Sequence, residues 1–254
     1  MTPLSVVIIT FNEEKNIGNC LASVKDVADE IVVVDSFSVD NTKQICEKHG
    51  ARVIQREFGG FIQQKNLAVS LATYPNILSL DADECLSVEL KQSIQSLKSN
   101  WQYDGYVVNR LTSFCGRWVR HSGWYPDRKL RLFIRDQGVF RGTNPHDRFE
   151  LHAGSTLGRI RGDLLHYTAE SEADFRAKME RYATIAAAEM HRQKRTISLP
   201  LLYLKTVAAF FRNYVIRLGF LDGIIGWKVC TISAGYTFQK YAKLRVLNKE
   251  NRLE

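Results

Sequence analysis

Several patterns that define large protein classes are missing from this 254-residue chain. Its five cysteines form no C-x-x-C pair, which excludes a zinc ribbon, and their odd number favours free thiols in a reducing compartment. Neither G-x-G-x-x-G nor G-x-x-x-x-G-K-[ST] occurs, which argues against dinucleotide oxidoreductases and P-loop enzymes, and H-E-x-x-H is also absent. No apolar run approaches the roughly 20 residues of a membrane span, and the short run Leu4–Thr10 lacks the basic flank of a secretory signal.

The composition is that of an ordinary globular protein, with 45% apolar and 24% charged residues, and the length suits one large domain or one domain with an appendage. The charge is unevenly distributed. Residues 1–175 contain 20 Lys and Arg against 22 Asp and Glu, whereas residues 176–254 contain 15 against 5. The positive excess therefore lies in the C-terminal segment, which indicates an anionic partner there, either a nucleic acid or a membrane surface.

The first hundred residues alternate short β-branched runs with helical patterns. Strands are expected at 4–10, 30–35, 51–55 and 76–80. Helices are expected from Ile17, from about Asp40 to Lys48, over 60–72 and over 87–98. Continuous apolar strands joined by crossover helices are typical of a parallel sheet covered on both faces.

The pattern changes after residue 100. Residues 106–110 and 129–133 resemble strands, and glycine, proline and aromatic residues interrupt the stretch between them. A helix is expected from Glu172 to about Lys194, with further helices to about residue 245. We therefore predict a domain over 1–170, made of halves 1–100 and 101–170, followed by a helical region over 171–254.

Polar residues cluster where the predicted parallel strands end, and ligands of such sheets bind at that edge. The most specific motif among these residues is Asp81-Ala82-Asp83, directly after an apolar strand. Two carboxylates one residue apart can both turn toward Mg²⁺ or Mn²⁺, which takes one or two such groups together with waters and substrate phosphates. The alternative is a solvated acidic turn that caps the next helix. The polar groups at the other strand ends favour the metal.

These strand ends resemble glycosyltransferase family 2 in their order and spacing. The resemblance rests on Ser5-Val6-Val7-Ile8-Ile9-Thr10-Phe11-Asn12-Glu13, Ile31-Val32-Val33-Val34-Asp35-Ser36, Asp40-Asn41-Thr42, Gln64-Lys65-Asn66 and Asp81-Ala82-Asp83. More narrowly, the chain resembles the bacterial lipopolysaccharide-core β-glucosyltransferases, through Asn144-Pro145-His146-Asp147, His166-Tyr167 and Phe220-Leu221-Asp222-Gly223.

The resemblance implies an α/β GT-A fold: a Rossmann-like, mostly parallel sheet with a mixed-sheet second half and a C-terminal helical region. It also implies an inverting, metal-dependent transfer of one sugar from a nucleotide sugar, by preference a UDP-hexose, to a hydroxyl of a lipid-linked or lipopolysaccharide-core glycan. The chain departs from the family pattern at Asp35-Ser36, where many members have two aspartates, and at Asp147, where glutamate is frequent. The Q-x-x-R-W motif of processive synthases is missing, which favours one sugar per encounter.

Under this resemblance the strand ends form the donor site. The residues expected to contact the nucleotide sugar are Thr10, Phe11, Glu13, Asp35, Lys65, Asp81 and Ala82. Asp35 would accept the uracil imide N–H, and Lys65 would meet the base or the diphosphate. Ordinary structural roles stay open for three of them: helix capping for Glu13, turn capping for Asp35 and solvation for Lys65.

The resemblance also implies a metal site and a catalytic base. Asp83 would bind Mg²⁺ or Mn²⁺, with His166 as a further ligand, as a donor to the diphosphate, or in a structural role. Asp147, expected in a loop beside His146, would take the proton of the acceptor hydroxyl; the alternative is an ordinary loop residue paired with Arg148 or Arg141. Arg128 and Arg131 would bind acceptor phosphate or the diphosphate, unless they lie on solvated strand faces.

The basic C-terminal region is expected to meet an anionic membrane through residues 197–249. Phe210, Phe211, Tyr214, Val215 and Leu218 are predicted to share one helical face, with Lys205, Arg212 and Arg217 interspersed. This describes either an interfacial helix on an anionic leaflet or a core helix packed on the catalytic domain. The expected location is the cytoplasm, peripherally at the inner face of the bacterial cytoplasmic membrane.

Two other functions compete with this interpretation. A sugar nucleotidyltransferase would use a Gly-rich N-terminal loop, which residues 10–13 do not supply. A non-catalytic nucleic-acid- or membrane-binding protein would use the basic tail, but tail aromatics at helical spacing with aliphatic residues favour lipid or core over nucleic acid.

Overall fold

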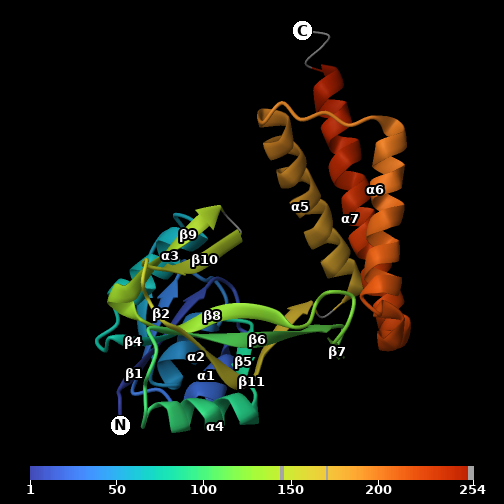
Figure 1. The fold of residues 1–254 in the computed structure, drawn as a ribbon. Helices are drawn as coiled ribbons and strands as arrows, with labels where there is room; N and C mark the ends of the chain where they lie inside the picture. Colours follow the sequence, from blue (N-terminus) through green and yellow to red (C-terminus); the bar gives the residue numbers. More distant parts are fainter. Residues whose placement is uncertain (144–145, 170, 251–254) are drawn as a thin grey trace. The chain divides into compact units, whose positions relative to one another are not determined.

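The structure is a computed structural model that describes residues 1–143, 146–169 and 171–250 (Figure 1). Its contacts divide the chain into two compact units. The first comprises residues 1–110 and 127–167, and the second comprises residues 111–126 and the described residues from 168 onward. The five cysteines are free, as the sequence predicts.

The N-terminal part of the first unit alternates strands and helices. In chain order they are β1 (Leu4–Thr10), α1 (Ile17–Val24), β2 (Glu30–Asp35), α2 (Thr42–Lys48), β3 (Arg52–Gln55), α3 (Phe61–Ser70), β4 (Asn76–Asp81), β5 (Glu84–Leu86) and α4 (Val88–Leu97). The four predicted strands and the helices that follow them are confirmed. Ser87 begins α4 by accepting a hydrogen bond from the Leu90 amide at 3.2 Å, which is a standard N-cap.

The next part of the chain contains further strands and a 3₁₀ turn, and most of these strands join the same sheet. They are β6 (Gly105–Phe114), β7 (Arg117–Val119), β8 (Asp127–Ile134), the 3₁₀ turn η1 (Arg135–Gln137), β9 (Gly138–Thr143), β10 (His146–Leu151) and β11 (Leu157–Ala169). The sheet order is β3-β2-β1-β4-β8-β6-β11-β5, with β7 paired to β6, and β9 and β10 form a separate antiparallel pair. Strands β1 to β4 pair in parallel and β8 joins β4 antiparallel. This confirms the predicted mostly parallel sheet with a mixed second half.

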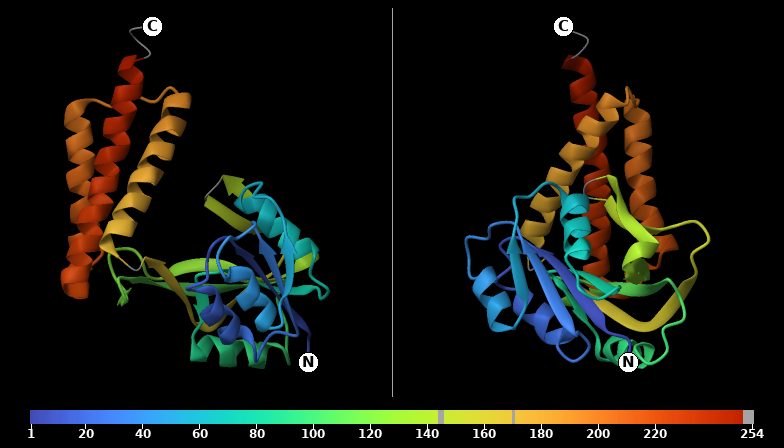
Figure 2. Two further views of the ribbon diagram at one scale, coloured as in Figure 1. Left: turned by 180° about the vertical axis from the view of Figure 1, so that it is seen from behind. Right: turned by 90° about the vertical axis from the view of Figure 1, so that its left-hand side faces the viewer.

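Apolar side chains cover both faces of the parallel strands. Figure 2 shows the ribbon of these strands with helices beside them. Leu4, Val6 and Ile8 of β1 belong to a cluster with residues of α1 and α4. Val7, between them, belongs to a second cluster with residues of α3, β9 and β10, including Phe149. Because both faces are filled, the polar groups of these strands emerge at the strand ends. The site therefore lies at the carboxyl edge.

The second unit contains the C-terminal helices that the sequence predicts. They are α5 (Glu172–Arg192), α6 (Leu199–Phe211), the π-helical turn η2 (Arg212–Ile216), the 3₁₀ turn η3 (Gly219–Asp222) and α7 (Gly223–Glu250). Helix α7 lies between α5 and α6 and contacts both (Figure 1). No helix within the described ranges has the length and hydropathy needed to cross a membrane.

One detail of this region differs from the prediction. A single helical face was expected for Phe210, Phe211, Tyr214, Val215 and Leu218. Phe210 and Tyr214 are instead half-buried and stack, with ring centroids 5.3 Å apart. Phe211, Val215 and Leu218 remain exposed.

Candidate active site

The loops that follow β1 and β2 are joined by hydrogen bonds at the carboxyl edge of the sheet. The Asn12 amide donates to Ser38 Oγ at 2.9 Å, and the Val39 amide donates to Asn12 Oδ1 at 2.9 Å. Phe11 and Phe37 are left exposed on these loops. Phe37 has a φ of 61°, an unfavourable conformation for a bulky residue, so the surrounding loop must hold it there.

Asp35, at the end of β2, is fully buried. Its carboxylate accepts hydrogen bonds from the Ser38 amide at 3.0 Å, from the Ser38 hydroxyl, and from Gln55 Nε2 at 3.2 Å. Thr10, at the end of β1, is also buried, and its hydroxyl has no partner among the residues that the structure describes. An unsatisfied buried hydroxyl costs free energy, so a ligand group or water at this edge would be stabilising.

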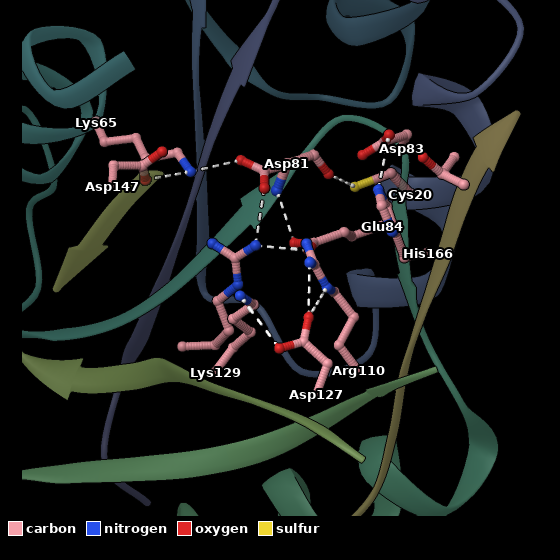
Figure 3. Close-up of polar contacts among 12 residues, drawn as sticks. Cys20, Lys65, Asp81, Asp83, Glu84, Arg110, Asp127, Lys129, Asp147 and His166 are labelled. Atoms are coloured by element: carbon pink, nitrogen blue, oxygen red, sulfur yellow. Dashed lines mark hydrogen bonds and ion pairs between the residues drawn. The ribbon is translucent and has the colours of Figure 1, made fainter. Parts of the chain in front are cut away.

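Lys65 of α3 connects two carboxylates from different elements (Figure 3). Its Nζ lies 2.8 Å from Asp81 Oδ1 and 2.8 Å from Asp147 Oδ2. Its side chain is 5% exposed, so the ammonium group is shielded from water and held by these two anions. Three predicted site residues therefore meet at one point.

Arg131 of β8 holds the other oxygen of Asp81. Arg131 Nη2 lies 2.8 Å from Asp81 Oδ2 and 2.5 Å from Glu84 Oε1. Burial alone would raise the pKa of Asp81, but the charges of Arg131 and Lys65 outweigh it and hold that pKa well below its usual range. Asp81 is therefore a permanent anion here. The alternative of a solvated strand face is wrong for Arg131, because its side chain is buried.

Glu84 continues this chain of alternating charges (Figure 3). It is fully buried, accepts a hydrogen bond from the Asp81 amide at 3.0 Å, and lies 3.3 Å from Arg110 Nη1. Arg110 in turn pairs with Asp127 at 2.7 Å. Burial would raise the pKa of Asp127, but Arg110 and Lys129 lower it.

Asp83 and His166 form a second pair beside this chain. His166 Nε2 lies 3.1 Å from Asp83 Oδ2, and the two side chains are 14% and 20% exposed. Within the described ranges, no three His, Cys, Asp or Glu side chains gather closely enough to hold a metal alone. A carboxylate and an imidazole nevertheless fit a catalytic divalent cation, which normally takes its remaining ligands from substrate phosphates and water.

The remaining predicted residues lie apart from these contacts. Glu13 Oε2 accepts from Asn16 Nδ2 at 2.7 Å, and Ala82 is buried in the core. Arg128 is exposed on β8. Asp147 lies on β10, not in a loop, and its partner is Lys65, while Arg148 pairs with Glu150. Asn144 and Pro145 of the predicted motif lie outside the described residues.

Sequence reasoning assigned no role to Glu84 or Arg110, and it considered Asp127 only as a substitute for the base Asp147. Glu84 directly follows the Asp81-Ala82-Asp83 motif, so its position in the sequence could have identified it as a candidate site residue. An acidic residue in that position is equally compatible with a solvated turn. Arg110 and Asp127 face one another only because β6 and β8 pair with Arg110 opposite Asp127. That register is a tertiary property without a local sequence pattern.

A family model described as Glycosyl transferase family 2 matches residues 5–153. Among curated proteins, an uncharacterized glycosyltransferase of Rickettsia bellii is 30% identical, over 96% of this chain and 87% of that protein. The lipopolysaccharide core biosynthesis glycosyltransferase LpsC of Rhizobium meliloti is 27% identical, over 94% and 93%.

Two solved structures share the fold across nearly the whole chain. The mannosyltransferase PcManGT of Pyrobaculum calidifontis, in complex with GDP-Man and Mn²⁺, matches with a TM-score of 0.55 at 15% identity, covering 96% of this chain and 87% of that one. S. aureus TarS 1–349, in complex with UDP-GlcNAc, matches with a TM-score of 0.50 at 16% identity, covering 99% and 92%. At these identities the similarity concerns the fold, which is the GT-A architecture expected from the sequence.

Proposed function

The chain belongs to glycosyltransferase family 2, and on that premise we propose that it transfers one hexose from a UDP-sugar, with inversion, to a hydroxyl of a lipid-linked or lipopolysaccharide-core glycan. Membership makes the chain a glycosyltransferase and excludes a purely structural basic protein. It also favours glycosyl transfer over nucleotidyl transfer. The similarity to LpsC supports the lipopolysaccharide core as the acceptor class.

The observation that carries the proposal is the position of Lys65 between Asp81 and Asp147. A buried ammonium group that bridges two carboxylates is a candidate binding group for a strongly anionic ligand. The donor diphosphate is an anion that Lys65 can bind in exchange for Asp147. Asp147 is then free to accept the proton of the acceptor hydroxyl as that oxygen attacks the anomeric carbon.

The nucleoside is assigned to the loops after β1 and β2. Phe11 offers an exposed apolar surface to the base, and the buried hydroxyl of Thr10 would gain a partner from the bound donor. Asp35 is proposed to recognise uracil. The imide N–H of the base would donate to the Asp35 carboxylate in place of the Ser38 hydroxyl. Glu13 and the backbone at Ala82 complete the donor contacts.

A divalent cation is assigned to Asp83 and His166. The pair presents one oxygen and one nitrogen ligand on partly exposed side chains. Mg²⁺ or Mn²⁺ bound there would neutralise the negative charge that develops on the departing nucleotide. The role left to Asp81 is to hold Lys65 and Arg131, whose charges already neutralise it.

The two regions of the chain are proposed to have different functions. Residues 1–170 would carry the donor and acceptor sites, with the exposed Arg128 available to an acceptor phosphate. Arg131 would act through Asp81 because it is buried. Residues 197–249 would bind the inner face of the bacterial cytoplasmic membrane, where a lipid-linked acceptor is made available. No nucleic acid is involved.

Replacement of Asp147 tests the assigned base. Asp147→Asn removes the proton acceptor while keeping the shape of the side chain, so UDP binding should persist and transfer should slow by about a hundredfold or more. The measurement is UDP release from the donor in the presence of an acceptor extract, together with calorimetric titration of UDP.

Glu150→Gln is the matched control, because Glu150 lies on the same strand and pairs with exposed Arg148. It should leave turnover within a few-fold of the wild type. Near wild-type turnover of Asp147→Asn, or loss of turnover in Glu150→Gln instead, would assign the base elsewhere.

A further inference from the structure

Helix α6 has the composition of a buried helix but is largely exposed. Its thirteen residues, LPLLYLKTVAAFF, include one charged side chain, Lys205, and one fully buried one, Leu202. A helix that is apolar all round is normally covered on every side. Here α6 contacts α7 along one side, and residues such as Leu204 and Val207 are 64% and 65% exposed.

Exposed apolar side chains continue from α6 through the turn into the start of α7. Figure 1 shows the path of these elements. We call this set of side chains the apolar strip; it comprises Leu199, Leu201, Tyr203, Leu204, Val207, Phe211, Val215, Ile216, Leu218, Phe220, Leu221, Ile224 and Trp227. So many exposed apolar side chains within one short segment of a globular protein indicate a site of contact with another apolar phase.

Four aromatic rings form a cluster at the turn end of the strip. Tyr214 lies 5.3 Å from Phe210, 5.4 Å from Trp227 and 6.2 Å from Phe220, measured between ring centroids. Phe220 and Trp227 are each nearly half exposed. Tyrosine and tryptophan, with apolar rings and polar tips, favour the boundary between lipid chains and water.

The charges around the strip are mainly positive. Between 199 and 228, all of which the structure describes, the cations are Lys205, Arg212, Arg217 and Lys228, of which Lys228 pairs with Glu172 of α5 at 2.9 Å. Asp222 is the one acid in this stretch; its side chain is 8% exposed and is engaged by His121, whose Nδ1 lies 2.9 Å from Asp222 Oδ1. The outward surface is therefore apolar and cationic, which complements an anionic lipid headgroup layer over an apolar interior.

We propose that the apolar strip inserts into the interface of an anionic bilayer, with α6 and the η2–η3 turn as the contacting elements. This narrows the membrane contact of the proposed function from residues 197–249 to 199–227. It also changes the expected salt dependence of membrane binding, since insertion of apolar side chains persists in high salt, whereas adsorption by charge alone does not. A second copy of this chain is less suitable as the occupant, because it would bring the cations Lys205, Arg212 and Arg217 of one copy against those of the other.

The test is sedimentation of the full-length protein with phosphatidylcholine vesicles containing phosphatidylglycerol, in low and high salt. The apolar variant carries Ile216→Ser, Leu221→Ser and Ile224→Ser, which are all more than half exposed. Each substitution removes an aliphatic side chain whose transfer from water into an apolar phase is favourable. The variant should therefore bind at least about tenfold more weakly at both salt concentrations.

Two further variants separate the contributions of position and charge. Ile185→Ser with Val246→Ser removes exposed aliphatic groups from α5 and α7, outside the strip, and should bind like the wild type. Lys205→Gln with Arg212→Gln should weaken binding in low salt only. Arg217 is left unchanged, because its side chain packs closely against Gly123.

Wild-type sedimentation that persists in high salt and falls in the apolar variant supports insertion. Absence of sedimentation, or equal binding of the wild type and the apolar variant, overturns it. A wild-type dimer that the apolar variant converts to monomer would overturn it too, in favour of a second copy. No nucleotide or sugar is present, so these results are independent of the assigned donor and acceptor.

Discussion

At the scale of single residues, Asp81 and Glu84 are each matched by cations from other elements. Asp81 is held by α3 through Lys65 and by β8 through Arg131, and Glu84 is held by β8 and β6. Because the anions are buried or half-buried, each would be costly without its partner. The pairs therefore fix the geometry of the Asp81–Asp83 turn before any ligand binds.

Glu84→Gln tests this fixation. The change removes a fully buried charge and leaves Arg131 and Arg110 without their shared anion, so the free energy of unfolding should fall by about 3–5 kcal/mol. Urea denaturation measures it. Glu47→Gln, at an exposed i,i+4 pair with Lys43, should change stability by less than about 1 kcal/mol. Equal effects from the two substitutions would contradict a structural role for Glu84.

The sequence predicted those candidate site residues whose role can be inferred from a local pattern of residues. Asp81 and Asp83 were identified from a strand end, Lys65 and Asp147 from the family resemblance, and the structure brings Lys65, Asp81 and Asp147 together. It did not predict that Asp35 would be enclosed by Ser38 and Gln55, or that Arg131 would be buried. Those properties depend on how strands pair and which side chains cover them.

At the scale of elements, the α6–α7 turn depends on close backbone approach. A Cβ on Gly226 would lie 1.8 Å from the carbonyl oxygen of Gly219 in η3, so α7 can begin beside this turn only with glycine there. The sequence predicted helices in this region, but not the π-helical and 3₁₀ turns, because a shifted hydrogen-bond pattern has no simple residue signature.

Two glycines of α7 should respond oppositely to the same change. Gly226→Ala forces the turn apart and should lower the free energy of unfolding by about 1–3 kcal/mol, a typical cost of overpacking. Gly235→Ala meets no atom within 4 Å and should raise it by about 0.5–1 kcal/mol, since alanine favours a helix. Urea titrations followed by circular dichroism measure both. Stabilisation by Gly226→Ala would contradict the close contact.

At the scale of the whole molecule, charge separates two kinds of surface. Residues 1–175 carry 22 acidic and 20 basic side chains, and they include the carboxylates assigned to the donor and metal. The excess of basic residues lies after 175, in the segment that carries the apolar strip. In the proposed function a nucleotide sugar comes from water and a glycolipid acceptor from the membrane, and the two surfaces would suit these two substrates.

Metal-dependent binding of UDP tests the central claim most directly. UDP, GDP and CDP are titrated calorimetrically into the full-length protein with and without Mn²⁺, and into Asp83→Asn and Asp35→Asn. In the presence of Mn²⁺ we expect the protein to bind UDP more tightly than GDP and CDP. In Asp83→Asn the affinity for UDP should no longer depend on Mn²⁺. Asp35→Asn should weaken UDP by about tenfold, the value of a hydrogen bond to a charged acceptor. Absence of nucleotide binding in Mn²⁺, or equal affinity for the three nucleotides, would contradict the assignment of a UDP-sugar transferase.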